Sequence, residues 1–195
     1  PLSMDVGSAA DLINGSTPMF NGRAKAPWVL NLQSAGEVLP YQSSTLVGKV
    51  ISLTEADQHT QGDAVEAQWN GSASALLALQ TPKASQNTAD LLARQGVVAF
   101  DLMVVQKPSA KVEFEMSYAP KSIAHREDFT AQLNSTAPNT WRRYRVDMAC
   151  FARQKIDFTE LNQGFGLVTS GSLTIRLANV VMEPNGKAQA DIKCN

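Results

Sequence analysis

The residues best suited to chemistry lie together in TWRRYRVDMACF, residues 140–151. This stretch holds one of the three tryptophans, three arginines, a tyrosine and Cys150, one of only two cysteines. It could place a nucleophilic cysteine beside basic groups, because neighbouring cations lower the pKa of a thiol. It could also stack a sugar ring on Trp141, or it could form one strand of a β-sandwich. The spacing of the residues favours one of these three hypotheses.

Period-two alternation favours the strand and divides its side chains between two faces. The apolar face is expected to point inward, so that the tryptophan and two of the arginines form an outward row. That row could contact a sugar or a partner domain, or it could cover an edge, with the Trp141 ring packed along an arginine stem. Cys150 follows at an apolar strand end and is expected to be buried, which argues against a reactive thiol. The outward set is Trp141, Arg143, Arg145 and Asp147, and the inward set is Tyr144, Val146 and Met148.

Other catalytic signatures are absent from the sequence. It contains no GxSxG elbow, HExxH, P-loop, GxGxxG or CxxC motif. His59 and His125 lie in polar, turn-like stretches, without a second histidine or cysteine at ligand spacing, and both are expected to be exposed loop residues. The carboxylates Glu66, Glu113 and Glu115 lie on polar strand faces, where solvent or a cross-strand Lys or Arg explains them better than glycosidase chemistry. The chain itself is therefore not expected to be an enzyme.

The acidic loop residues and the cysteines leave two alternatives open. Calcium prefers oxygen ligands, and Asp5, Asp57 and Asp63 lie on expected loops without a DxDxDG-type spacing. A structural calcium ion therefore stays an option without a location, and no other metal or cofactor is expected. Two cysteines are too few for a disulfide framework. A buried thiol at Cys150 and a terminal thiol at Cys194 are favoured, and a bridge between them is the minor alternative.

Length, composition and charge limit the class of protein. The chain has 195 residues, of which 44% are hydrophobic and 18% charged, which suits one domain with a substantial core. Its net charge of −1 offers no basic excess for nucleic acid. No apolar run reaches the roughly 18–20 residues that cross a bilayer, so no membrane span is expected. Because the chain begins at Pro1, we expect a piece of a longer protein, and a missing signal peptide says nothing about secretion.

Strands must position these residues, because alternation dominates the chain and helical periodicity is scarce. Segment 111–118 alternates as a half-buried antiparallel strand does, and segment 97–105 precedes it across a turn that contains proline and serine. Eight or nine such strands, with turn signals every 8–15 residues, predict an all-β jelly-roll sandwich. Further strands are expected at 28–32, 47–53, 64–69 and 173–181.

Peripheral segments and the other aromatic residues complete the expected organisation. Trp28 and Trp69 share strand faces with apolar residues and are expected in the core, whereas Tyr41 and Tyr118 lie near strand ends and could line a cleft between loops. Short peripheral helices are expected at 8–13, 88–95 and 157–163. The expected division is an N-terminal arm or linker at 1–18, the sandwich at 19–184 and a C-terminal tail at 185–195.

Residues 141–183 resemble the end of a C-terminal domain found in bacterial family-3 glycoside hydrolases, the exo-1,3/1,4-β-glucanases or glucan glucohydrolases. The shared pattern is a tryptophan, an alternating strand, a Cys–Phe pair, a loop aspartate and a final series of apolar residues around a Thr and a Gly. Segments 20–32, 65–80 and 89–116 resemble earlier strands of the same domain, so the resemblance covers about residues 20–183. The matching positions are Trp141, Cys150, Phe151, Asp157, Phe165, Leu167, Thr169, Gly171, Leu173, Ile175, Asn179 and Val180.

The resemblance implies a galactose-binding-domain-like jelly roll that follows two catalytic domains in a secreted or periplasmic bacterial enzyme. The nucleophile and the acid/base would belong to those upstream domains, so no catalytic residue is expected on this chain. Many relatives have cysteines in the loop after the central hairpin, but segment 118–128 has none, so Cys150 cannot bridge to it.

The implied function is a non-catalytic accessory domain that packs on or near the catalytic domains of the same polypeptide. The alternative is a carbohydrate-binding module with its own affinity for β-glucan. The candidate contact residues, for sugar or for a partner domain, are Trp141, Arg143, Arg145, Tyr118 and Tyr41.

Overall fold

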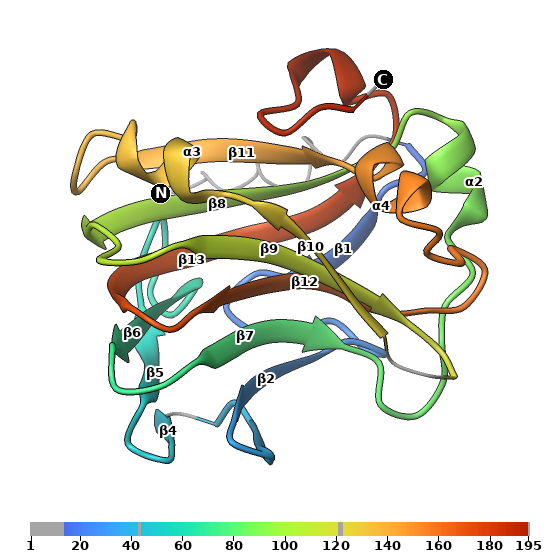
Figure 1. Cartoon of the computed structure of the whole chain (residues 1–195). Coiled ribbons are helices and arrows are strands. Elements are labelled where there is room, and N and C mark those ends of the chain that lie inside the picture. The colour runs from blue at the N-terminus through green and yellow to red at the C-terminus, as the bar shows by residue number, and fades with distance from the viewer. Residues whose placement is uncertain (1–13, 43, 121–122, 195) are drawn as a thin grey trace.

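The strands of the computed structural model, which describes residues 14–42, 44–120 and 123–194, form two antiparallel sheets (Figure 1). The seven-stranded sheet consists, in order, of β11 (Trp141–Asp147), β8 (Val97–Gln106), β13 (Ser172–Glu183), β6 (Ala64–Asn70), β5 (Ile51–Ala56) and β4 (Ser44–Val47), with β1 (Thr17–Phe20) paired to β13. The six-stranded sheet consists of β10 (Ile123–Asp128), β9 (Val112–Tyr118), β12 (Leu161–Thr169), β7 (Ala75–Gln80), β2 (Val29–Ser34) and β3 (Glu37–Pro40). This architecture confirms the predicted all-β jelly-roll sandwich.

The two sheets enclose one apolar core, to which alternate residues of each strand contribute. Phe100 on β8 lies at its centre and forms ring contacts with four aromatic residues. Trp28 and Trp69 are 3% and 1% exposed, as predicted for core residues. The inward residues of β8 are all fully buried, as the alternation predicted: Val98, Phe100, Leu102 and Val104.

Short helices lie at the ends of the strands, and only one of them was predicted. Helix α2 (Ala89–Ala93) falls within the segment 88–95, where a helix was expected. Segment 157–163 is a turn followed by the start of β12, so its predicted helix is wrong. The Asp157 carboxylate accepts hydrogen bonds from the Thr159 N–H and hydroxyl, and this closes the turn. The helix expected at 8–13 lies outside the described residues. Within the described residues, the other helical elements are α3 (Thr130–Asn134), α4 (Ala149–Arg153) and the 3₁₀ turn η2 (Lys187–Gln189).

The strand expected through residue 151 ends at Asp147, and this corrects two assignments. Asp147 was placed on the outward face, but it is 1% exposed and accepts hydrogen bonds from the backbone N–H groups of Ala149 and Cys194. Cys150 lies on α4, not at a strand end, and it forms a disulfide with Cys194. The favoured expectation of two separate thiols was therefore wrong.

The disulfide forms because the C-terminal segment returns along β11. Ile192 pairs with Val146 in a parallel bridge, and the Asp147 N–H donates to the Ile192 carbonyl at 2.9 Å. Cys194 is thereby brought beside α4, 44 residues from its partner. The residues expected as a tail after 184 thus include a segment that packs against the sandwich.

Two segments differ in detail from their expected structures. Segment 47–53 is not a single strand: it contains the last residue of β4, a turn at 48–50 with Gly48 in the left-handed region at φ 55°, and the first three residues of β5. Segment 118–128 was taken as a loop, but from Ile123 onward it forms β10 and pairs along β9. His125 consequently lies half-buried on a strand, not on an exposed loop, whereas His59 is exposed as expected.

Candidate functional site

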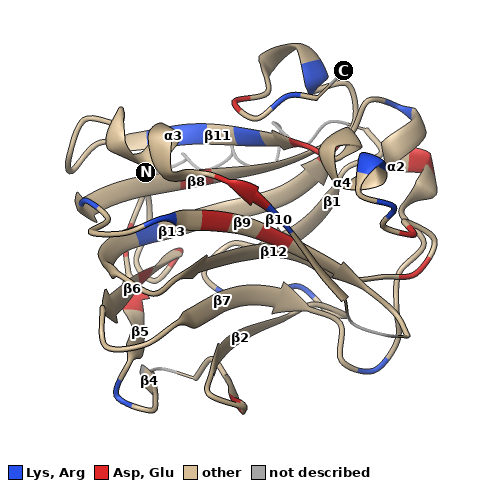
Figure 2. Cartoon of the chain, in the orientation of Figure 1, with Lys and Arg blue, Asp and Glu red and all other residues tan. Residues whose placement is uncertain are grey.

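The predicted outward row of β11 lies on the outer face of the seven-stranded sheet, where Trp141, Arg143 and Arg145 are each half-buried. Arg143 Nη1 lies 3.1 Å from Asp101 Oδ1 on β8 and also donates to a backbone carbonyl of β13. Arg145 Nε lies 3.2 Å from Glu183 Oε1. Both guanidinium groups are therefore already engaged in ion pairs between strands. Figure 2 shows the basic positions along β11 in blue. The row braces the sheet and leaves Trp141 at its end.

The two predicted tyrosines lie at other places on the sandwich. Tyr118 ends β9, packs against the core and stacks on the His125 ring, with centroids 5.9 Å apart. Tyr41 follows β3, and its N–H donates to the Leu30 carbonyl at 2.8 Å. The structure thus distributes the candidate residues over a face of one sheet and two strand ends of the other. It does not gather them into one site.

The outer face of the six-stranded sheet carries a polar row that the sequence analysis did not identify. Asn31 Nδ2 donates to Gln80 Oε1 at 2.7 Å, and Gln80 Nε2 donates to Gln163 Oε1 at 2.9 Å. Gln163 Nε2 in turn donates to the Glu115 carbonyl at 3.2 Å. Arg126 Nη2 completes the row, 3.8 Å from Glu115 Oε1. The row, defined as these five residues, crosses the adjacent strands β2, β7, β12, β9 and β10.

Gln163 reaches this face because of a β-bulge in β12. It has the same parity as Phe165 and Leu167, which lie in the core, so strict alternation would also place Gln163 inside. The register against β7 shifts between Gln163 and Phe165, and Gly164 instead faces the core, where an added Cβ would lie 3.1 Å from the Trp28 ring. A bulge adds one residue to a strand and reverses the alternation beyond it. This is why the sequence pattern did not reveal the row.

An apolar floor lies beside the row. Leu76, Ala78 and Val168 form a cluster separate from the core and are buried although they belong to the outer face. Gly166 lies between this cluster and the row. A Cβ on Gly166 would lie 2.6 Å from Gln163 Nε2, so the glycine leaves room for the amide. Amide groups beside such a floor can bind a ligand that combines hydroxyl groups with apolar C–H surfaces.

Glu115 is the residue of the row with an unsatisfied group. Its side chain is 7% exposed, and its Oε2 has no hydrogen-bond partner. Burial raises the pKa of the Glu115 carboxyl above its ordinary value, and Arg126 and the Gln163 amide offset only part of this effect. A buried acceptor without a partner is costly to the folded state. The unpartnered Oε2 is therefore a buried cost within the row.

The loop carboxylates that were considered for calcium stabilise their own loop. Burial by itself would raise the pKa of Asp63, but hydrogen bonds from the backbone N–H groups of residues 58, 59 and 60 lower it below its usual value. Asp57 Oδ1 accepts a hydrogen bond from the Gly62 N–H at 2.7 Å. Asp5 lies outside the described residues, and a structural calcium ion stays a prediction without a location.

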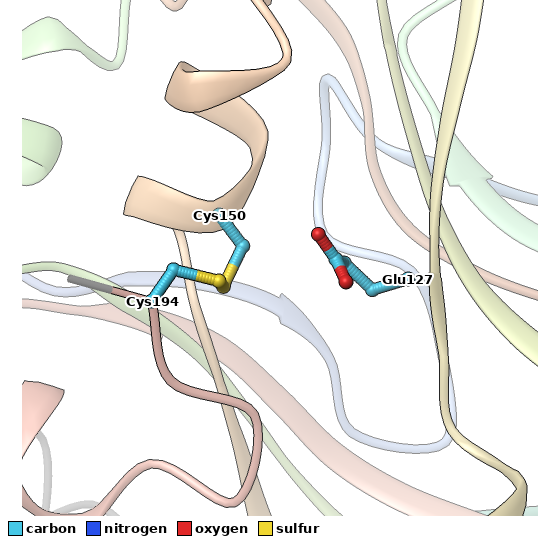
Figure 3. A group of neighbouring side chains, drawn as sticks. All are labelled: Glu127, Cys150 and Cys194. Carbon is cyan, nitrogen blue, oxygen red and sulfur yellow. A yellow bond between two sulfur atoms is a disulfide. The ribbon is translucent and has the colours of Figure 1, made fainter.

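Glu127 lies beside the disulfide, and the three side chains form the one group of metal-ligand type within the described part of the chain (Figure 3). Both sulfur atoms belong to the Cys150–Cys194 bond and carry no thiolate. Glu127 Oε1 accepts a hydrogen bond from Gln154 Nε2 at 2.8 Å. The group is thus neither a thiolate metal site nor a cysteine nucleophile.

Among the described residues, no helix is long and apolar enough to cross a membrane.

Comparison with known proteins identifies similar domains. The family model Exop_C, described as galactose-binding domain-like, matches residues 26–182. No curated protein matches the chain. Among solved structures, the exo-1,3/1,4-β-glucanase ExoP of a Pseudoalteromonas species is similar, with 14% identity and a TM-score of 0.71 over 94% of this chain. This chain covers 21% of the length of that glucanase.

Two further structures are of single domains. The extra C-terminal domain of the same glucanase has 14% identity and a TM-score of 0.70, over 86% of this chain and 91% of that one. A family 30 carbohydrate-binding module from a cellulosomal cellulase of Clostridium thermocellum has 8% identity and a TM-score of 0.63, over 89% and 99% of the two chains. At these identities the likeness shows the fold alone.

Proposed function

Because this chain belongs to the Exop_C family of galactose-binding domain-like proteins, we propose that it is a non-catalytic accessory domain that binds carbohydrate for a β-glucan-degrading enzyme. The family match confirms the resemblance that the order of sequence motifs indicated. Packing on the catalytic domains was the first expectation from the sequence, and affinity for sugar was the alternative. The polar row on the six-stranded sheet now favours affinity for sugar.

The single observation that carries this proposal is the row itself, a line of amide and charged side chains that crosses five adjacent strands of one sheet. The side chains of Asn31, Gln80 and Gln163 provide amide donors and acceptors along one line, as the hydroxyl groups of a sugar chain require. Arg126 and Glu115 contribute opposite charges, so the row suits a neutral glycan. The adjoining apolar floor can pack against the C–H faces of the sugar rings.

The parent enzyme and its location belong to the same proposal. The similar glucanase is named for its action on 1,3/1,4-β-glucan, and we infer that this domain is attached to a β-glucan-degrading exo-glucosidase with β-glucan as its ligand. The catalytic domains of the same polypeptide would be its permanent partners. The Cys150–Cys194 disulfide supports a secreted or periplasmic location, because disulfides persist in oxidising compartments.

Titration calorimetry and affinity electrophoresis of the isolated chain with laminarin and cello-oligosaccharides test the binding. We expect saturable heat and retarded migration, and an affinity about tenfold weaker in the Gln80→Ala variant. Gln68→Ala is the matched control, because Gln68 is an exposed glutamine on β6 of the other sheet. Absence of heat and of retardation with a folded chain would overturn the affinity for carbohydrate.

The accessory role has a separate test in the parent enzyme. Deletion of this domain is expected to lower kcat/KM on polymeric β-glucan or the thermal stability of the enzyme. An enzyme in which both quantities are unchanged by the deletion would contradict the accessory role.

A further inference from the structure

A hollow lies apart from the polar row, where four chain segments meet. It has a volume of about 680 Å³ and is formed by the β1–β2 turn, the start of β2, the residues after β3 and the β5–β6 loop. This volume falls within the range of small-molecule sites. None of the five residues of the row lines it. Its lining includes Arg23, Trp28, Tyr41, Glu55, Gln61 and Gly62.

The hollow combines an aromatic base with a polar rim. Trp28 is almost fully buried beneath it, and Tyr41 is half-buried beside it. Burial raises the pKa of the Tyr41 phenol, and the Glu55 carboxylate raises it further. Arg23 and Gln61 are exposed on the rim. One cation and one anion balance each other here, so the lining favours a polar ligand without net charge.

The walls are held in place without any ligand. Gly22 has a φ of 91°, and a Cβ at this position would lie 2.1 Å from the Gly62 carbonyl oxygen. The β1–β2 turn and the β5–β6 loop are therefore in direct backbone contact. Asp57 and Asp63 fix the second loop through its own N–H groups. A hollow with such braced walls loses little entropy when it binds a ligand.

We propose that this hollow is a second carbohydrate site that binds one or two units of a neutral sugar, with Tyr41 as the stacking surface. Arg23, Glu55 and Gln61 would hydrogen-bond the hydroxyl groups of that sugar. The row extends over five strands and suits several consecutive units of a glycan. The hollow is bounded by two loops and suits only one or two sugar units. The two sites do not share residues, so each can fail without the other.

Nuclear magnetic resonance titration with glucose, cellobiose and laminaribiose tests the proposal. We expect the amide resonances of Gly22 and Gly62 to shift in a saturable manner. Tyr41→Ala and, independently, Gln61→Ala should weaken this binding about tenfold or more. Gln80→Ala in the row and the control Gln68→Ala should leave it unchanged. Gln61 is exposed, so its variant keeps the test decisive if Tyr41→Ala does not fold.

Two outcomes would overturn the second site. One is the absence of shifts at Gly22 and Gly62 at saturating disaccharide concentration. The other is binding of disaccharides that Gln80→Ala abolishes and Gln61→Ala does not change, which would assign them to the row. In the second case the proposed function would stand and only the second site would be rejected. If disaccharides bind in the hollow but laminarin does not bind in the row, the row would be rejected as a binding site and the hollow would stand.

Discussion

Glu115 shows how a single residue departs from the behaviour that its strand position predicts. Its parity on β9 places it on the outer face, and a cross-strand arginine was expected as its partner. Arg126 lies directly opposite in the β10 register and is that partner. Of the two expected explanations, solvent or a cross-strand basic residue, the structure shows the second, because Glu115 is only 5% exposed. The result is an anion that is buried and only partly compensated.

The raised pKa of Glu115 predicts a specific dependence of stability on pH. The folded state binds a proton here more readily than the unfolded chain, whose carboxyl has the ordinary pKa of 4.5. This group therefore destabilises the fold progressively as the pH rises above about 4.5 and through the raised value. Glu115→Gln should remove the contribution, so the variant should gain stability relative to the wild type between pH 4 and pH 8.

Urea unfolding at a series of pH values measures this difference. The lowered pKa values of Asp63 and Asp128 act in the opposite direction, but they are common to both proteins and cancel in the comparison. A difference in unfolding free energy that does not change with pH would contradict the prediction.

At the scale of elements, the end of β11 joins three parts of the chain. Asp147 accepts the first N–H of α4 and the N–H of Cys194, and Lys187 lies 3.8 Å from its carboxylate. Asp191 accepts hydrogen bonds from the Arg145 N–H and from Arg142. The C-terminal segment is therefore held by hydrogen bonds and ion pairs as well as by the disulfide. These contacts tie the segment that was expected as a C-terminal tail to the sandwich.

Removal of the disulfide should destabilise the fold measurably without unfolding it. The double variant Cys150→Ala, Cys194→Ala is expected to lose about 2–4 kcal/mol, because the bond closes a loop of 44 residues in the unfolded chain. Urea unfolding gives the value. Dithiothreitol should produce the same loss in the wild type and no change in the double variant. Equal stability of the oxidised wild type and the double variant would contradict this account.

At the scale of the whole molecule, Phe100 holds the two sheets together. It lies on the seven-stranded sheet and contacts Phe114 and Phe165 of the other sheet, with ring centroids 5.9 Å and 5.1 Å away. It also contacts Phe129, just before α3, and Tyr144 on β11. The hollow at Tyr41 is lined by segments of both sheets, so it depends on their relative position.

Phe100→Ala should therefore cost about 3–5 kcal/mol, since it leaves a cavity between the two sheets. Leu46→Ala is the control, because Leu46 is 52% exposed and its truncation should change stability by no more than about 0.5 kcal/mol. Urea unfolding of both variants provides the comparison. A loss at Phe100 as small as that at Leu46 would show that the cluster does not join the sheets.

The sequence by itself determined the all-β character of the chain, several of its strands with the residues that face the core, and the absence of the common catalytic motifs from the sequence. Alternation is a local property, so the inward positions of β8 and the outward Trp141, Arg143 and Arg145 could be predicted without knowing their neighbours. The ordered motifs also led to the correct family.

Only the tertiary structure decided how distant residues combine. The disulfide joins cysteines 44 residues apart, and the Gln80–Gln163 bond of the polar row joins residues 83 apart. Gln163 faces outward through a bulge that alternation does not show, and the hollow at Tyr41 exists because Gly22 and Gly62 meet at a loop crossing. Strand order and register bring these groups together, and both depend on the packing of the whole sandwich, not on the local pattern of any one strand.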